Sequence, residues 1–326
     1  MPRSSRSSRL LASFALAAAA GAALPGAIAC NPCDLYYRPI EWRAEEVPVE
    51  ADLFAVAAAE GVVVAVGEGG AIARQAGEAA WTAPASATGA ALRGVEFAAA
   101  EVVVAVGDGG VVVRSVDAGE TWGAVDVGVK DDLAAVGCDD AGTCVAAGDG
   151  VLLVSTDAGA SWAPPVEAPA ELGALRAVGV NTGFAEFVAV GLAGAVVISP
   201  DGQTWTAVPG ASADFHAVAQ TASNWALGGA DGALFILTNG VFIDESQFDR
   251  ATITGLTREG RWMVRADGVV VYGHPAWVDE SVRTEEELPP LHAVVAIGDE
   301  VVVVGDGGLV GRARQAEAWE CDRRYH

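Results

Sequence analysis

Residues 92–122 read LRGVEFAAAEVVVAVGDGGVVVRSVDAGETW, and they contain the pattern that repeats along this chain. Their first four residues follow a rule: a large apolar residue, a variable one, Ala or Gly, then Val or Leu. A period near 40 residues with strand-like content is typical of a β-propeller, in which each repeat forms one blade. The sequence predicts an all-β, seven-bladed propeller in one domain, with four antiparallel strands per blade and blades that start near residues 53, 92, 133, 175, 215, 253 and 291.

The interior of residues 92–122 supports this interpretation. Residues 101–106 are almost continuously apolar, which is expected of a strand whose two faces both pack against neighbouring sheets. Residues 107–110, Gly-Asp-Gly-Gly, then predict a tight turn, because Asp and Gly tolerate positive φ. Residues 111–114 form the next expected strand, and a fourth strand should follow Trp122.

Three segments that follow expected third strands share a second pattern. They are SVDAGETW at residues 115–122, STDAGASW at 155–162 and the shorter SPDGQTW at 199–205. These segments resemble the Asp-box, or BNR, repeat. Their order after VAVGDGG is similar to that of the photosystem II stability/assembly-factor family. The resemblance covers residues 42–319. It implies a propeller fold and says little about function.

The residues of these segments have a structural interpretation. The Asp can accept backbone N–H bonds within the turn, the Gly supplies positive φ, and the Trp buries a large ring between blades. The alternative is that the Trp rings stack on carbohydrate. The structural set is Ser115, Asp117, Gly119, Trp122, Ser155, Asp157, Gly159, Trp162, Ser199, Asp201, Gly202 and Trp205.

Two segments compete to close the ring. Trp42 precedes Leu53 by the same 11 residues that separate Trp81 from Leu92, so a strand around residues 36–43 would complete the last blade. Residues 313–319, ARQAEAW, echo residues 73–81 and predict a strand for the same place. The sequence leaves both possibilities open.

The N-terminus has the features of an exported protein. Residues 1–29 combine three Arg, a short apolar run and the Ala-Ile-Ala of a cleavage site, which together predict a signal peptide. Cys30 follows directly and resembles the lipidated Cys of bacterial lipoproteins. We therefore expect a membrane-anchored protein on the periplasmic or cell-surface side, with residues 30–35 as a tether and residues 36–326 as the propeller. Ordinary cleavage and free secretion are the alternative.

The five cysteines are consistent with an exported, lipid-anchored protein. An exported chain favours disulfides, and lipidation of Cys30 would leave four cysteines to pair. Cys138 and Cys144 lie within one repeat and predict a hairpin disulfide. Cys33 and Cys321 would join the two chain ends. No Cys or His pairs have zinc-like spacing, so no metal is expected.

Composition argues against several classes of function. The net charge is −24 and Lys130 is the one lysine, whereas nucleic-acid binding needs clustered Lys and Arg. No P-loop, Rossmann, G-x-S-x-G or H-E-x-x-H pattern stands in a supporting context, so no cofactor is expected and a non-catalytic role is favoured over an enzyme. We expect a monomer that meets the membrane only through a lipid on Cys30.

The variable second residue of each repeat marks a candidate site. In a propeller the innermost strand starts on the face where ligands usually bind, near the central channel. Two Arg and two of the four His occupy this position, which predicts a cationic mouth for an anionic group. The alternative is that these side chains fill space between blades or bond adjacent turns. The candidate residues are Phe54, Arg93, Arg176, His216, Thr254 and His292, with Ala134 in the third repeat.

Carboxylates are expected on the same face, in the turns after the second strands. They could hold Ca²⁺ or repel anions, or they could simply reflect the preference for Asp beside Gly in such turns. They are Glu68, Asp108, Asp149, Asp231, Asp267 and Asp306.

These observations predict a non-catalytic extracytoplasmic propeller. It would bind a protein or a small anionic ligand and would act as an interaction or assembly-factor-like module. The alternative is a glycan-binding or glycoside-hydrolase-like propeller related to sialidases.

Overall fold

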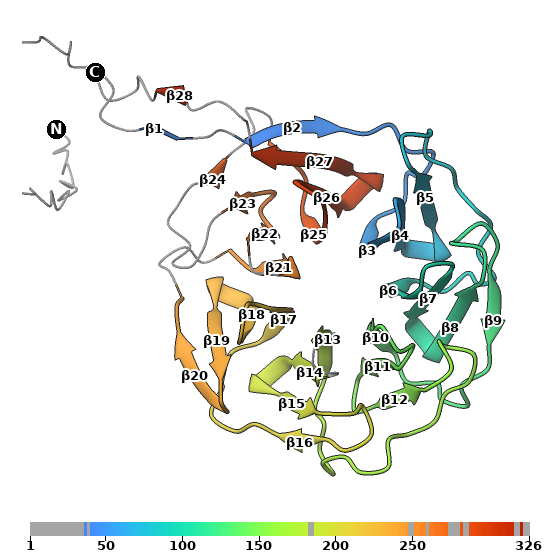
Figure 1. Cartoon of the computed structure of the whole chain (residues 1–326), viewed down its shortest axis with the longest axis vertical. Coiled ribbons are helices and arrows are strands. Elements are labelled where there is room, and N and C mark those ends of the chain that lie inside the picture. The colour runs from blue at the N-terminus through green and yellow to red at the C-terminus, as the bar shows by residue number, and fades with distance from the viewer. Residues whose placement is uncertain are drawn as a thin grey trace, which may run out of the picture. The chain divides into compact units, whose positions relative to one another are not determined.

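Seven antiparallel sheets surround a central axis (Figure 1). The computed structural model describes residues 36–37, 40–181, 186–246, 251–258, 261–272, 281–282, 287–315 and 320–321. The propeller lies within one compact unit, residues 37–320. β1 (Tyr36–Tyr37) and β28 (Glu320–Cys321) pair in a separate two-stranded sheet. The prediction of an all-β, seven-bladed fold is confirmed.

The blades are numbered along the chain, and the first strand of each blade lies nearest the axis (Figure 1). Blades 1 to 3 consist of β3 (Leu53–Ala59), β4 (Val62–Gly67) and β5 (Ile72–Ala76); β6 (Leu92–Ala99), β7 (Val102–Gly107), β8 (Val111–Ser115) and β9 (Gly123–Val125); and β10 (Leu133–Cys138), β11 (Cys144–Gly148) and β12 (Leu152–Ser155).

Blades 4 to 6 each have four strands. They are β13 (Leu175–Asn181), β14 (Glu186–Gly191), β15 (Val196–Ser199) and β16 (Thr206–Ala207); β17 (Phe215–Gln220), β18 (Trp225–Gly229), β19 (Leu234–Thr238) and β20 (Val241–Asp244); and β21 (Ile253–Leu256), β22 (Trp262–Arg265), β23 (Val270–Tyr272) and β24 (Ser281–Val282).

Blade 7 closes the ring with a strand from the other end of the chain. It consists of β25 (Leu291–Ile297), β26 (Glu300–Gly305), β27 (Val310–Gln315) and the outer strand β2 (Ile40–Ala44). Trp42 pairs with Ala313. Its ring lies so close to Gly311 that a Cβ there would be 2.1 Å from it. Of the two candidates for the outer strand, the N-terminal one takes this place, and residues 310–315 form the third strand.

Blades 1 and 3 have three strands in their sheets instead of the predicted four. A single bridge replaces the fourth strand in each, Arg74 with Thr82 and Val154 with Ala163. Prolines follow these bridges closely, at Pro84 in blade 1 and Pro164 in blade 3. Proline has no N–H for a sheet ladder, so these outer strands stop after one bridge.

The core lies between neighbouring blades. The second strands supply most of it, because their alternate residues face the two adjacent blades. Val104 and Val106 of β7 pack toward blade 3, whereas Val103 and Ala105 pack toward blade 1, and all four are fully buried. This two-sided burial explains why the second strands are continuously apolar.

The turns after the second strands lie beside the starts of the innermost strands. In blade 2, Leu92 pairs with Gly107, the last residue before the 3-10 turn Asp108–Gly110. A Cβ on Gly107 would lie 2.0 Å from the carbonyl oxygen of Ala91, so only glycine fits there. The second residue of each repeat and the turn carboxylates therefore share one face, as the sequence predicts.

Candidate functional site

The channel mouth is the set of second-position residues at the starts of the innermost strands: Phe54, Arg93, Ala134, Arg176, His216, Thr254 and His292. In blade 2 the Arg93 Nε and Nη2 each donate to one carboxylate oxygen of Asp108, both at 2.9 Å. This hydrogen-bonded pair raises the pKa of Arg93 and lowers that of Asp108.

Two further residues of the mouth, Arg176 and His292, also contact a turn carboxylate. Arg176 donates from Nη1 to Asp149 in the turn of blade 3. His292 Nε2 lies 2.6 Å from Asp306 Oδ1 in its own blade. Three of the six predicted turn carboxylates thus contact mouth residues: Asp108 and Asp149 accept hydrogen bonds from Arg93 and Arg176, and Asp306 lies within hydrogen-bond distance of His292. The mouth presents paired charges of both signs.

An aromatic ring joins three blades at the mouth. The guanidinium carbon of Arg93 lies 4.5 Å from the centre of the Phe54 ring, a cation–π distance. On its other side Phe54 meets the His292 ring edge to face, with centroids 5.5 Å apart. Phe54 of blade 1 is therefore held between blades 2 and 7.

Two other mouth residues, Thr254 and His216, are less available to a ligand. The Thr254 hydroxyl donates to the carbonyl oxygen of Leu291, 2.7 Å away in the next blade. His216 is half-buried, and its burial lowers the pKa of the imidazole; Arg176 acts in the same direction and Asp214 opposes it.

Sequence reasoning missed a second set of carboxylates on this face. The residue just before the innermost strand is Asp in several repeats, and its carboxylate caps a turn of the preceding blade. Asp132 accepts the Gly109 N–H at 2.7 Å, Asp52 accepts that of Gly307 at 2.7 Å, and Asp214 accepts that of Ala193 at 2.7 Å. The recurring Asp before the large apolar residue is the pattern that would have indicated them.

The three Asp-box-like segments form hydrogen-bonded turns where the third strands end, on the side of each blade away from the mouth. In the first, the Ser115 hydroxyl donates to Asp117 Oδ1 at 2.7 Å and accepts the Gly119 N–H at 2.8 Å. The Thr121 N–H and hydroxyl also donate to Asp117, and these bonds lower the pKa of Asp117 to about 2. The Trp122 Nε1–H bonds the Gly119 carbonyl at 3.1 Å.

The second and third segments repeat this network. Ser161 takes the place of Thr121 around Asp157, and the shorter third turn uses the Gln203 and Thr204 N–H groups around Asp201. Trp205 is buried. Trp122 is partly buried against the core between blades 1 and 2, and Trp162 against the core between blades 2 and 3.

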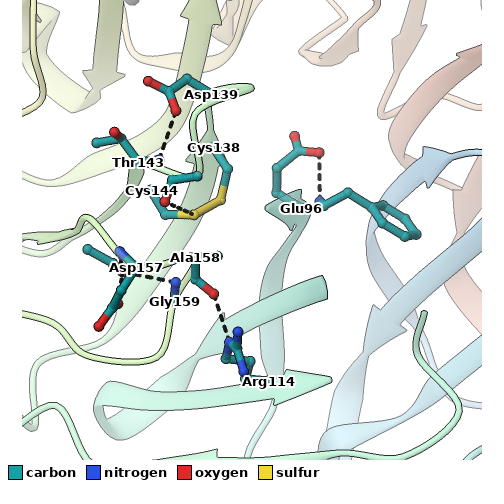
Figure 2. Close-up of a disulfide and its surroundings, with 12 residues drawn as sticks. Glu96, Arg114, Cys138, Asp139, Thr143, Cys144, Asp157, Ala158 and Gly159 are labelled. Atoms are coloured by element: carbon teal, nitrogen blue, oxygen red, sulfur yellow. Dashed lines mark hydrogen bonds between the residues drawn. A yellow bond between two sulfur atoms is a disulfide. The ribbon is translucent and has the colours of Figure 1, made fainter. Parts of the chain in front are cut away.

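An arginine of the preceding blade bonds each of the two longer turns. Arg74 Nε donates to the Ala118 carbonyl and Arg114 Nε to the Ala158 carbonyl, both at 2.7 Å. Figure 2 shows the second of these bonds beside the turn of Asp157. Ala118 and Ala158 both have positive φ, 53° and 55°, which the sequence did not indicate.

A cavity of about 450 Å³ occupies the channel beyond the mouth. All seven innermost strands contribute to it through residues near their ends, where they turn into the second strands. Valine and alanine form most of the wall. Five polar side chains face it from blades 2, 3, 5 and 6: Glu96, Asp140, Gln220, Thr257 and Arg258.

Glu96 is the most perturbed acid in this cavity. Its Oε1 accepts the N–H of Phe97 at 2.9 Å. Burial raises the pKa of Glu96 to about 7, and the positive charge of Arg258 offsets part of this rise. The fifth residue of the other six repeats is Ala57, Gly137, Gly179, Ala219, Thr257 or Val295. The sequence could have indicated Glu96 as a site residue, because it is the one charged residue at this position of the repeat.

Cys138 and Cys144 form the predicted pair in blade 3, with sulfurs 2.09 Å apart (Figure 2). They sit at directly paired positions of β10 and β11. Between them the Asp139 carboxylate accepts the N–H groups of Ala141 and Thr143 at 3.0 and 2.8 Å. Cys138 also lines the cavity. Cys30 and Cys33 lie outside the described residues, as does the predicted signal peptide, so the second disulfide and the lipid stay predictions.

The part of the chain that the structure describes holds no group of three His, Cys, Asp or Glu side chains arranged for a metal ion. It also holds no helix of the length and apolar character needed to cross a membrane.

No protein-family model matches this chain, and no curated protein does. Many solved structures resemble it, among them three propellers. A structure of YCF48 bound to D1 peptide has a TM-score of 0.67 at 15% identity, over 87% of this chain and 99% of that one. YCF48 from Cyanidioschyzon merolae has a TM-score of 0.66 at 15% identity, over 84% and 98%. A GH74 xyloglucanase from Xanthomonas campestris has a TM-score of 0.65 at 17% identity, over 86% and 54%. At these identities the likeness establishes the fold.

Proposed function

We propose that the channel mouth binds an exposed segment of a partner protein, in a non-catalytic role similar to that of an assembly factor. The observation that carries this proposal is the pairing of the mouth's cations with turn carboxylates. Because Arg93, Arg176 and His292 each have an Asp partner, a small free anion would gain little net charge attraction. A peptide carries both donors and acceptors, which matches paired charges.

The mouth keeps hydrogen-bonding capacity for such a ligand. Arg93 uses Nε and Nη2 toward Asp108, and a guanidinium has five N–H donors. Its side chain is 40% exposed and that of Asp108 is 38% exposed. Phe54, in contact with Arg93 and with the His292 ring, adds an ordered aromatic group for an apolar side chain. These groups form a mixed polar and aromatic surface of the kind that recognises peptides.

A propeller with the same fold supports this proposal. The structure of YCF48 that shares this fold holds a bound D1 peptide. The three hydrogen-bonded Ser-Asp-Gly-Trp turns support a further proposal, that the chain is an Asp-box repeat propeller. The GH74 enzyme shares the fold as well, but no arrangement of carboxylates or aromatic rings described above favours glycan cleavage.

A peptide-display selection tests the proposed site. Peptides enriched on the full chain should bind at least about tenfold more weakly to Phe54→Ala and to Arg93→Gln, because each change removes a contact that a peptide would use. Val166→Ser is the matched control, since Val166 is 85% exposed and lies away from the mouth in the loop after β12. Binders that are equally sensitive to Val166→Ser, or insensitive to both mouth changes, would refute the proposal.

We also propose that the mature protein is an exported lipoprotein anchored through Cys30. The basic and apolar segments of residues 1–29 and the oxidised Cys138–Cys144 pair support an oxidising compartment. Mass spectrometry of the mature N-terminus should show a lipid on Cys30. A mature chain that begins elsewhere, or an unmodified Cys30, would contradict this address.

A further inference from the structure

The cavity beyond the mouth has the general character of a small-molecule site. Its volume of about 450 Å³ falls within the range of known ligand pockets. Val178, Val218 and Val294 give it apolar walls from three blades, and a few polar side chains converge on it from others. Polar atoms nevertheless make up most of the surface that the cavity exposes, which suits a small ligand with several polar groups.

Three of these polar groups have hydrogen-bonding capacity to spare within the described chain. Glu96 uses one oxygen for the Phe97 N–H and keeps the other. The amide of Gln220 and the guanidinium of Arg258 have no partner among the described residues. Thr257 differs, because its hydroxyl is already engaged with the backbone of Trp262.

The charges of the lining define the ligand. Arg258 of blade 6 is a cation, whereas Glu96 of blade 2 and Asp140 of blade 3 are acids. The lining residues of blades 1, 4, 5 and 7 carry no charge. A ligand with one carboxylate and one amine would satisfy Arg258 and Glu96 together, and a second positive group would find Asp140 at the exposed rim.

We propose that this cavity is a binding site for a small zwitterion of the amino-acid type, with a preference for a basic side chain. The site is separate from the mouth, since none of the mouth residues lines the cavity. The ligand carboxylate pairs with Arg258, its amine with Glu96, and Gln220 supplies a neutral donor and acceptor between blades. The net charge of −24 favours the entry of a cation.

Calorimetry with three free amino acids tests the proposal. L-lysine should bind more tightly than L-leucine, and L-leucine more tightly than L-glutamate. Glu96→Gln and Arg258→Gln should each weaken lysine binding about tenfold or more, because each removes one charge-assisted hydrogen bond. Glu101→Gln is the matched control. It removes the same charge from the same hairpin of blade 2, at an exposed residue outside the cavity lining.

Three results would overturn the proposal: no heat from lysine, tighter binding of glutamate, or lysine affinity unchanged in both Glu96→Gln and Arg258→Gln. Arg93→Gln separates this site from the peptide site, because it should weaken peptide binding and leave lysine binding unchanged.

A direct observation of Glu96 makes the test independent of the variants. Its side-chain carboxyl ¹³C resonance, assigned with Glu96→Gln, should titrate near pH 7 in the free protein. Saturating lysine should shift that midpoint downward, because a bound amine stabilises the carboxylate. A midpoint that lysine does not move would also overturn the proposal.

Discussion

The two ends of the channel differ in how their charged side chains are paired. At the mouth, Arg93 and Asp108 share two hydrogen bonds of 2.9 Å and both are substantially exposed. In the cavity, Glu96 interacts with Arg258 only through space, and no ion pair joins them within the described residues. The mouth's charges are therefore compensated by the fold itself. The charges of the cavity are left for protons or ligands to compensate.

The difference follows from where the turns lie. Each turn after a second strand returns beside the start of an innermost strand. The carboxylates of three such turns, Asp108, Asp149 and Asp306, thereby reach a second residue of their own or the next repeat. At the other end of its innermost strand, Glu96 has only the Phe97 N–H as a hydrogen-bond partner among the described residues. A charged residue there, such as Glu96, depends on what the channel contains.

Breaking the mouth's scaffold should have the largest effect. Gly107→Ala places a Cβ 2.0 Å from the Ala91 carbonyl, so the turn that holds Asp108 must move. We expect a loss of about 3 kcal/mol in the free energy of unfolding, measured by urea denaturation.

Gly109→Ala is the matched control in the same turn. A Cβ at Gly109 meets nothing within 4 Å, but its φ of +71° carries a backbone penalty. This change should cost only about 1 kcal/mol. Equal losses for the two variants would show that the close approach at Gly107 does not restrain the turn.

Glu96 should make stability depend on pH. Its pKa is raised from 4.5 to about 7 in the folded protein, so the folded state holds the proton more tightly than the unfolded state. The contribution of Glu96 to stability is fully present below about pH 4.5 and is lost as the pH rises through about 7. The loss should be about 2 kcal/mol, allowing for solvent in the channel.

The difference in unfolding free energy between the wild type and Glu96→Gln, measured at pH 5 and pH 8, isolates this effect from other titrating groups. Glu96→Gln should be relatively more stable at pH 8. A difference that is the same at both pH values would show that Glu96 has an ordinary pKa.

The mouth's ion pair should contribute least. A double-mutant cycle with Arg93→Gln and Asp108→Asn should give a coupling energy below about 1 kcal/mol, because both side chains are well exposed. The coupling should decrease further in 0.5 M salt. A coupling above about 2 kcal/mol would mean that the mouth is far less solvated than its exposure indicates.

The propeller fold could be predicted from the sequence because the patterns that specify its strands are short and recur in each repeat. The seven phrases mark the innermost strands, and the Trp42 spacing pointed to an N-terminal outer strand. The two missing outer strands were harder to foresee, because the effect of Pro84 and Pro164 depends on which N–H groups the sheet would have needed.

The site was only partly predictable. The position of Arg93 followed from the repeat, but its bidentate bond to Asp108 depends on how one turn folds back on the strand. His216 and Thr254 share the same repeat position as Arg93, yet one is half-buried and the other bonds the next blade. Glu96 was not predicted because it is the one charged residue at the fifth position of the repeat, and a single occurrence forms no pattern.

The outer strand of blade 7 has a consequence for how the chain is made. β2 leaves the ribosome near the start of synthesis, but its partner β27 appears about 270 residues later, as the pairing of Ile40 with Gln315 shows. Contacts between such distant residues form late and slow folding. Until then the edge of β2 stays open, and an open edge is prone to pair with other chains. A nascent or truncated chain that lacks residues 310–315 would thus carry β2 as an unpaired strand until the last repeat is complete.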